Sequence, residues 1–191
     1  QNTMREQGRF ESQRTFWHGY LEGRSTVLAL PIDVPKRPKY INKIGDNVIF
    51  DIPVSGIAKL AKSTSSSSFN VLFSAYCILL SRYANQKNVV VGTPVAARTK
   101  ASFLDVVGLF VNTTPYNVNI DFHETVRDFI KRIHSMSINI LANQDYQLDW
   151  IVDELHIKRE SNHSPLFDVM FTMENMEVPP MQMADCHIQQ L

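Results

Sequence analysis

The chain has 191 residues, and its 19 lysines and arginines balance its 19 aspartates and glutamates. This neutral balance gives no reason to expect electrostatic capture of nucleic acid or of an acidic membrane. An apolar content of 44% can support the core of one domain, or of a large part of one. The two cysteines, Cys77 and Cys186, lack metal-ligand spacing, so we expect no disulfide framework, no metal site and a reducing compartment.

We find no targeting or membrane-spanning segment in the sequence. Residues 1–10 are polar and charged, unlike a signal peptide. The longest apolar stretch, residues 71–80, is too short to cross a bilayer. We therefore expect a soluble, cytoplasmic chain.

The first quarter of the sequence predicts one helix, a connector and a strand. Residues 11–21 place three aromatic residues on one helical face, namely Phe16, Trp17 and Tyr20. Residues 24–45 carry three spaced prolines and no periodicity, which is typical of an extended connector. Residues 47–53 alternate apolar and polar side chains, which predicts a half-buried strand.

Two helices are predicted next, separated by a run of serines. A short helix follows Ser55, and Ser68, the last serine of the run, is placed to cap the second helix. That second helix, residues 69–84, is apolar around nearly its whole circumference, so we expect it to be buried.

Three further segments lead to the middle of the chain. Residues 88–95 predict a short strand, and residues 96–105 a loop. Residues 107–114 form an apolar, β-branched run that predicts a buried central strand, with Pro115 at an edge or bend. Within this run, Asn112 would be a buried amide, which needs hydrogen-bond partners and so indicates a polar border such as a cavity.

The last third of the chain completes an alternating pattern. Helices are predicted at residues 124–143 and 149–156, and a strand at residues 166–172. Helices interleaved with strands indicate an α/β layered architecture with a mixed sheet flanked by helices.

The sequence lacks the usual catalytic motifs. It has no GxSxG elbow, no phosphate-binding or dinucleotide glycine loop and no HExxH. None of the six histidines has an aspartate four residues later. We therefore expect no self-sufficient acid–base set in this chain.

Some polar residues are candidates for binding. Arg98 follows a predicted strand and could grip a phosphate or carboxylate, although a loop arginine is more often simply solvated. Asp145 lies at the end of a predicted helix, where it could orient a loop, bind a substrate amine or act as a capping group. Arg159 begins a charged turn of a kind that is usually a solvated connection.

Three segments, in this order, resemble the signature motifs of condensation domains of nonribosomal peptide synthetases. Residues 107–113, Val-Gly-Leu-Phe-Val-Asn-Thr, match the family's Gly-x-Phe-Val-Asn-Thr motif. Residues 143–146, Asn-Gln-Asp-Tyr, match the start of the next motif, although Gln-Leu-Asp at 147–149 replaces the family's Pro-Phe-Glu. Residues 159–166 resemble the motif that runs from Arg-Asp to Pro-Leu, with departures at Glu160 and 162–164.

The resemblance implies a fold like that of chloramphenicol acetyltransferase, with two α/β lobes around a tunnel. Carrier proteins would dock at the two tunnel mouths and insert phosphopantetheine arms, and an amine would attack a donor thioester to form an amide. The family's His-His-x-x-x-Asp-Gly motif, which belongs to the N-terminal lobe, does not occur here. We therefore interpret residues 1–45 as a helix and inter-lobe connector, and 46–191 as a C-terminal lobe that stops before the family's last elements.

The resemblance also assigns expected roles to named residues. Tunnel or substrate contacts would come from Gly108, Asn112, Thr113 and Asp145, and phosphopantetheine or carrier contacts from Arg98 and Arg159. No catalytic residue, metal or directly bound cofactor is expected in this chain. The expected partners are the N-terminal lobe, donor and acceptor peptidyl carrier proteins and an adenylation domain.

Alternatives stay open at this point. Asn112 could instead be a buried amide bonded to a neighbouring loop, with no ligand. The whole chain could be a docking module without chemistry, or a relative that epimerises or cyclises its substrate.

Overall fold

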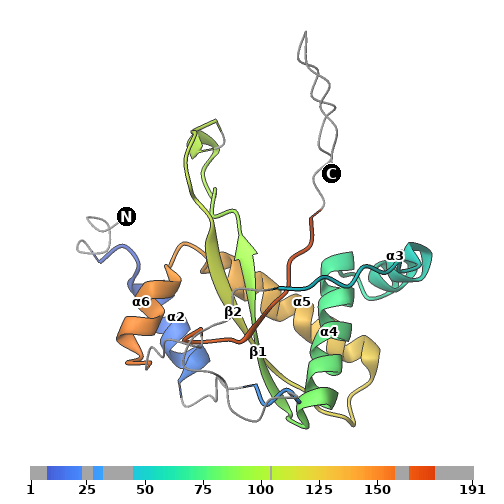
Figure 1. The fold of residues 1–191 in the computed structure, drawn as a ribbon. Coiled ribbons are helices and arrows are strands. Elements are labelled where there is room, and N and C mark those ends of the chain that lie inside the picture. Colours follow the sequence, from blue (N-terminus) through green and yellow to red (C-terminus); the bar gives the residue numbers. More distant parts are fainter. Residues whose placement is uncertain (1–7, 23–27, 32–44, 104, 158–163, 175–191) are drawn as a thin grey trace.

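The computed structural model describes residues 8–22, 28–31, 45–103, 105–157 and 164–174 (Figure 1). Its elements, in chain order, are α2 (Glu11–Leu21), α3 (Val54–Ser63), α4 (Ser68–Ala84), β1 (Asn88–Val95), the short 3₁₀ helix η1 (Ala101–Phe103), β2 (Asn112–Asn119), α5 (Val126–Ala142), α6 (Leu148–Glu154) and β3 (Val169–Met170). The order confirms the predicted α/β class.

The three described strands form a mixed sheet in the order β2-β1-β3. β1 pairs antiparallel with β2, with Gly92 opposite Pro115, and parallel with β3, with Val91 opposite Val169. Pro115 therefore lies on an edge strand of this sheet, as predicted, since proline cannot donate to a ladder. The pairing continues past Pro115 to Asn119, so the proline does not end the strand.

Helices flank the sheet, with α2 and α6 on one side and α3 and α4 on the other (Figure 1). The core lies where they meet the strands and contains Val89, Val91 and Val118. Aromatic rings connect α4 to both edges of the sheet. The centroid of the Phe73 ring in α4 lies 4.8 Å from that of Tyr116 and 5.5 Å from that of Phe171. Burying such large rings stabilises this side of the sheet.

At the centre of β1, Gly92 lies directly beneath the ring of Phe167. A Cβ atom at Gly92 would meet the Phe167 ring at 2.5 Å. Because this separation is far below van der Waals contact, a side chain at position 92 would require the Phe167 ring to shift.

Several predicted elements are confirmed. α2 and β1 have the predicted bounds, and Trp17 is fully buried, with its indole N–H donating to the carbonyl of Asn143. α4 begins one residue earlier than predicted, because Ser67 and not Ser68 caps it by accepting from the amide of Asn70 at 3.2 Å.

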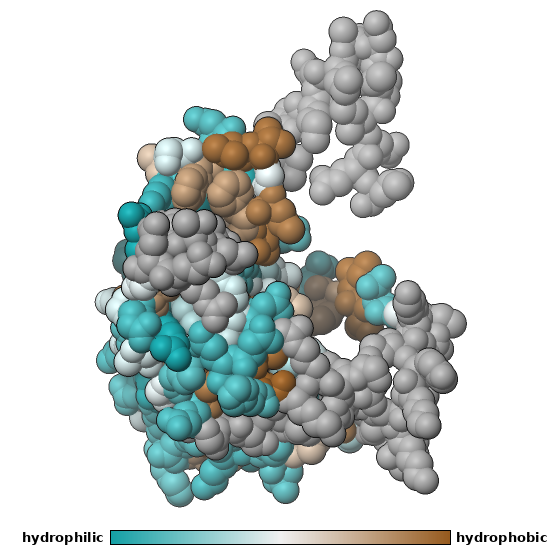
Figure 2. Space-filling model, turned by 90° about the vertical axis from the view of Figure 1, so that its left-hand side faces the viewer, coloured by the Kyte–Doolittle hydropathy of each residue, from teal (hydrophilic) through white to brown (hydrophobic). Residues whose placement is uncertain are grey.

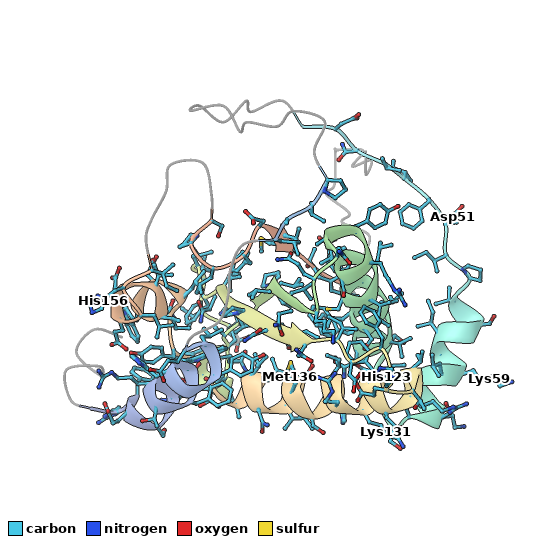
Figure 3. All side chains as sticks on the ribbon, turned by 90° about the horizontal axis from the view of Figure 1, so that it is seen from below. Asp51, Lys59, His123, Lys131, Met136 and His156 are labelled. Atoms are coloured by element: carbon cyan, nitrogen blue, oxygen red, sulfur yellow. The ribbon has the colours of Figure 1, made fainter. Side chains whose placement is uncertain are left out.

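The predicted strand at residues 47–53 is wrong. These residues form no regular element and pair with no described strand, and their apolar side chains are exposed, including Val48 at 86% and Phe50 at 72%. Figure 3 shows Asp51 of this segment well away from the sheet. Alternating apolar residues favour a strand conformation, but a strand forms only where a neighbouring strand is available to hydrogen-bond with it.

The predicted helices are less completely buried than their sequences suggested. Leu79 and Tyr83 of α4 are exposed, at 51% and 64%. In α5 the predicted inner stripe is buried at Phe129, Ile130 and Ile133, whereas its remaining members are exposed, namely Val126, Ile138 and Leu141. Ile138 and Leu141 border an open cavity beside α4 and β1, so they are only partly covered.

The predicted central strand at residues 107–114 is wrong in its first half. Residues 105–111 are an exposed loop, with Val107 fully exposed and Leu109 at 91%, and β2 begins only at Asn112. The predicted strand at 166–172 shortens to β3, although the Phe171 amide also donates to the Gly92 carbonyl at 2.9 Å.

Some predictions fall outside the described residues. They concern most of the proline-rich connector, Arg159 and Cys186. No helix among the described residues is long and apolar enough to cross a membrane.

Candidate functional site

Asn112, at the start of β2, ties the sheet to the turn between α5 and α6. Its Nδ2 donates to the carbonyls of Gln144 and Tyr146, both at 2.8 Å, and its Oδ1 accepts from the amide of Leu148 at 3.2 Å. Oδ1 also accepts from the amide of Thr113, at 2.9 Å. Both donors and the acceptor of this 5%-exposed amide are therefore used by backbone groups.

The same contacts fix the backbone on either side of Asp145. Gln144 and Tyr146 flank Asp145, so Asn112 holds both neighbouring carbonyls. The Asp145 carboxylate accepts from the hydroxyl of Thr99, with both oxygens at 3.2 Å. Asn112 thus acts on Asp145 through the backbone, and Thr99 acts on its side chain.

Arg98 holds the loop that precedes β2. Its guanidinium donates to the carbonyls of Phe103, Val106 at 2.9 Å and Gly108 at 3.1 Å. Its Cζ lies 4.2 Å from the centre of the Phe110 ring, which is within cation–π range. Arg98 therefore holds this loop at Phe103 and at residues 106–110, and the predicted phosphate contact stays a prediction.

Gly108 lies at the exposed tip of this loop. Its φ is 155°, a backbone conformation that L side chains rarely adopt, and a Cβ would meet only Phe110, at 3.8 Å. Glycine is therefore needed here for the backbone conformation, and close approach of a ligand stays a prediction.

A cavity of about 390 Å³ lies beneath the loop. Its lining includes Asp145 and Thr99 at the polar end, Lys100 beside them, and apolar groups from Phe10, Ala97, Phe103, Leu109, Phe110 and Val111. A cavity of this size with few polar groups is typical of a small-molecule site.

The structure thus brings together some of the predicted site residues. Asp145 lines the cavity, and Arg98 and Gly108 belong to its covering loop. Asn112 lies outside the lining but bonds to the backbone on both sides of Asp145, whereas Thr113 bonds only to Asn112 in the contacts above and is not brought to the cavity. Arg159 lies outside the described residues. Sequence reasoning missed Thr99, Lys100 and Gln147, whose only signal was their closeness in sequence to Arg98 and Asp145.

Other chemistry is not assembled in the described part of the chain. No group of histidine, cysteine and acidic residues there could hold a metal ion. His123 and His156 lie on opposite sides of the molecule (Figure 3). Cys77 is fully buried in α4, and burial raises the pKa of its thiol, so it stays protonated and is not a nucleophile.

Comparison with known proteins decides the family. A sequence model of the Condensation domain matches residues 1–190. The chain belongs to the condensation domain family. A condensation domain of the chloramphenicol acetyltransferase-like fold accounts for the helix-flanked mixed sheet.

The relatives of this condensation domain chain are much longer than the chain. Tyrocidine synthase 3 of Brevibacillus parabrevis is 36% identical over 180 residues, which are 91% of this chain but 3% of that protein. Surfactin synthase subunit 2 of Bacillus subtilis is 31% identical over 187 residues, which are 96% of this chain and 5% of that protein. The homologues therefore place the family in nonribosomal peptide and antibiotic biosynthesis.

Solved structures agree on the fold. The four-domain nonribosomal peptide synthetase holo-AB3403, bound to AMP and glycine, superposes with a TM-score of 0.83 and 27% identity, covering 90% of this chain and 14% of that one. The X-domain from teicoplanin biosynthesis superposes at 0.78 with 21% identity, covering 84% and 36% of the two chains. The second likeness concerns the fold alone.

Proposed function

We propose that this chain is the C-terminal lobe of a condensation domain that forms an amide bond between a carrier-bound acyl thioester and a carrier-bound amine. The observation that carries the proposal is the cavity at Asp145, because residues of two segments that resemble family motifs, 107–113 and 143–146, line it. The His-His-x-x-x-Asp-Gly motif is absent from the chain, so an N-terminal lobe would supply that histidine. Residues 1–45 would then connect the two lobes.

In this proposal Asp145 orients the amine. Its carboxylate lines the cavity and already accepts from one hydroxyl, which leaves lone pairs for an ammonium or amine. Positioning of the two reactants can supply much of the rate of such a reaction. Asn112 is a positioning residue, because it fixes the backbone on both sides of Asp145 and does not line the cavity.

The exposed apolar loop is the proposed contact with the N-terminal lobe. Val106, Val107, Leu109 and Val111 are exposed by 45–100%, and apolar surface gathers at the top of the molecule in Figure 2, where this loop lies. An exposed apolar group of this kind indicates an interaction site. Arg98 would act by holding this loop in shape.

Phosphopantetheine enters the proposal only as the arm of the partner carrier proteins. These donor and acceptor carriers, together with an adenylation domain that loads them, are the proposed partners. No residue of this chain is assigned to hold the arm.

The test reconstitutes the domain. The chain is produced joined to its N-terminal lobe, and amide formation between loaded donor and acceptor carriers is measured by mass spectrometry. We expect transfer by the joined protein, with Asp145→Asn raising KM for the acceptor more than it lowers kcat. Asp149→Asn is the matched control, because Asp149 is an exposed carboxylate in the nearby α6 and does not line the cavity.

Two results would overturn parts of the proposal. If the joined protein binds both carriers but transfers nothing, the chain is a docking module without chemistry. If Asp145→Asn leaves the acceptor KM unchanged, Asp145 has only a structural role.

A further inference from the structure

Gln147 adds a polar side chain to the lining of the cavity at Asp145. It is the N-cap residue of α6, with a φ of −71° and a ψ of 141°, but its side chain makes no capping hydrogen bond. Oδ1 of Asn112 accepts from the first amide of α6, that of Leu148, in its place. The side chain of Gln147 is therefore not used in the way that N-cap side chains usually are.

One hydrogen bond determines how the Gln147 amide is oriented. Its Nε2 donates to the backbone carbonyl of Asp145 at 3.3 Å. A carbonyl oxygen only accepts hydrogen bonds, so the amide nitrogen must lie on this side and Oε1 on the other. Oε1 accepts from no described residue, and the protein does not enclose it. Because Gln147 lines the cavity, this open acceptor is available to a ligand there.

The Asp145 carboxylate is a second acceptor in the same cavity. Its two oxygens share one donor among the described residues, the hydroxyl of Thr99, at 3.2 Å from each. An ionised carboxylate has about four lone-pair sites, so most of its accepting capacity is unused. Gln147 is two residues from Asp145, so one cavity holds two acceptors that the same ligand can reach.

The rest of the lining favours an ammonium group with an apolar body. Aromatic rings come from Phe10, Phe103 and Phe110. Lys100 also lines the cavity, but it is exposed and its Nζ lies 5.8 Å from the centre of the Phe103 ring, whereas Asp145 is half-buried. Water therefore screens the repulsion between Lys100 and a bound cation more than the attraction to Asp145.

We propose that Gln147 makes the cavity at Asp145 selective for primary amines. A primary ammonium has three N–H donors, so it can bond to Asp145 and to Oε1 of Gln147 at the same time. An ammonium that carries two further carbon groups has a single donor and can bond to only one of the two residues. The assignment of the bound group as the amine of a carrier-bound acceptor rests on the proposed function, and Gln147 is then a specificity-determining residue for that acceptor.

The selectivity is a feature of this chain, because the motif that residues 143–149 resemble has proline in place of Gln147. Proline has no polar side-chain atom, so it would leave no acceptor at this position. In the neutral form that attacks a thioester, a primary amine has two N–H donors and a secondary amine has one. Gln147 therefore favours an acceptor with a primary amine over a cyclic imino acid.

The experiment compares two cations that share an aromatic body and differ in their number of donors. Benzylamine and N,N-dimethylbenzylamine, both protonated at neutral pH, are titrated into the whole chain and followed by NMR chemical shifts. Gln147→Leu removes the acceptor, whereas Gln147→Glu keeps an acceptor and loses the donor to the Asp145 carbonyl. Gln144→Leu is the matched control, because Gln144 lies in the same turn, donates through Nε2 to the Leu141 carbonyl and does not line the cavity.

We expect the unsubstituted chain to bind benzylamine more tightly than the dimethyl compound. Gln147→Leu should lower this ratio of affinities by about 3- to 10-fold, as the loss of one net hydrogen bond provides. Gln144→Leu should leave the ratio unchanged, and Gln147→Glu should retain the preference. Shift changes at Ala97 and Val111, which line the cavity, locate the probe in the unsubstituted chain and do not depend on the folding of any variant.

Equal binding of the two compounds by the unsubstituted chain, or the same ratio in Gln147→Leu, would overturn the proposal. A Gln147→Glu variant that behaves like Gln147→Leu would contradict it too, because Gln147 would then act only by holding the backbone of Asp145. The result is separate from the transfer assay. A chain that prefers benzylamine but transfers nothing contradicts only the proposed function, and a chain that transfers without this preference contradicts only the role of Gln147.

Discussion

Two buried asparagines use the same amide in opposite ways. Asn112 bonds only to backbone groups, which belong to its own strand, the α5–α6 turn and the first residue of α6. Through its side chain Asn70 bonds only to other side chains, which come from the serine run before α4 and from α5. Both amides are at most 5% exposed.

The difference separates a structural clamp from an adjustable network. A mutation does not remove a backbone carbonyl or N–H group. The backbone partners of Asn112 therefore need a side-chain amide at position 112 whatever residues surround it. Side-chain partners can be replaced together with the amide, so the Asn70 network can change as a unit. The contacts of Asn112 hold the backbone on both sides of Asp145, whereas those of Asn70 join the start of α4 to α5.

The largest effect is expected from Asn112→Leu. The carbonyls of Gln144 and Tyr146 and the amide of Leu148 would lose their partner in a buried place. The free energy of unfolding should fall by about 3–5 kcal/mol, measured by urea denaturation.

Asn119→Leu is the matched control for this clamp. Asn119 belongs to the same strand but is exposed, and its side chain bonds only to the carbonyl oxygen of the Asn88 side chain. Its unfolding free energy should stay within about 0.5 kcal/mol of the parent value. A similar loss in both variants would mean that the clamp contributes nothing specific.

A smaller effect is expected from Asn70→Leu. Ser137 and His134 would lose their common partner, but both lie beside a cavity that water can reach. The same urea experiment should give a loss of about 1–3 kcal/mol. A loss as large as that of Asn112→Leu would contradict the distinction between clamp and network.

The double variant Asn70→Leu/Ser137→Ala sharpens the distinction further. Removing both partners of a buried hydrogen bond can be nearly neutral, because neither group of that bond is left unpaired. His134 still lacks its partner in the double variant, so we expect recovery to be incomplete. We expect the double variant to regain at least half of the stability lost in Asn70→Leu. Additive losses in the double-mutant cycle would show that the two residues do not act as a pair.

The smallest effect on stability is expected from Arg98→Gln. Like Asn112, Arg98 bonds to backbone carbonyls, but two of its three bonds are exposed. We expect a loss below about 1 kcal/mol together with faster hydrogen exchange in residues 101–110. Unchanged exchange there would mean that Arg98 does not hold the loop.

The sequence correctly predicted those elements whose signal lies within their own residues. β1 is a continuous apolar strand, and α2 has one aromatic face, so both have the predicted bounds. The predictions from sequence that failed concern pairing between segments that are distant in the sequence. Residues 47–53 have the alternation of a strand but no partner in the described sheet, and residues 107–111 are apolar yet exposed.

The sequence identified several residues of the candidate site, but it did not determine which groups they contact or what each residue does. The amide of Asn112 was expected to need partners, and the structure identifies them as the backbone around Asp145. The Asn70 network was not predicted, because its members are 64 and 67 residues apart and nothing in the spacing links them. Long-range polar contacts of this kind follow from helix packing, which periodicity alone does not determine.

The close contact between Gly92 and Phe167 also limits how this chain can evolve. Any side chain at position 92 must take the space that the Phe167 ring occupies. An alanine there would displace the Phe167 ring, so we expect positions 92 and 167 to vary as a size-matched pair.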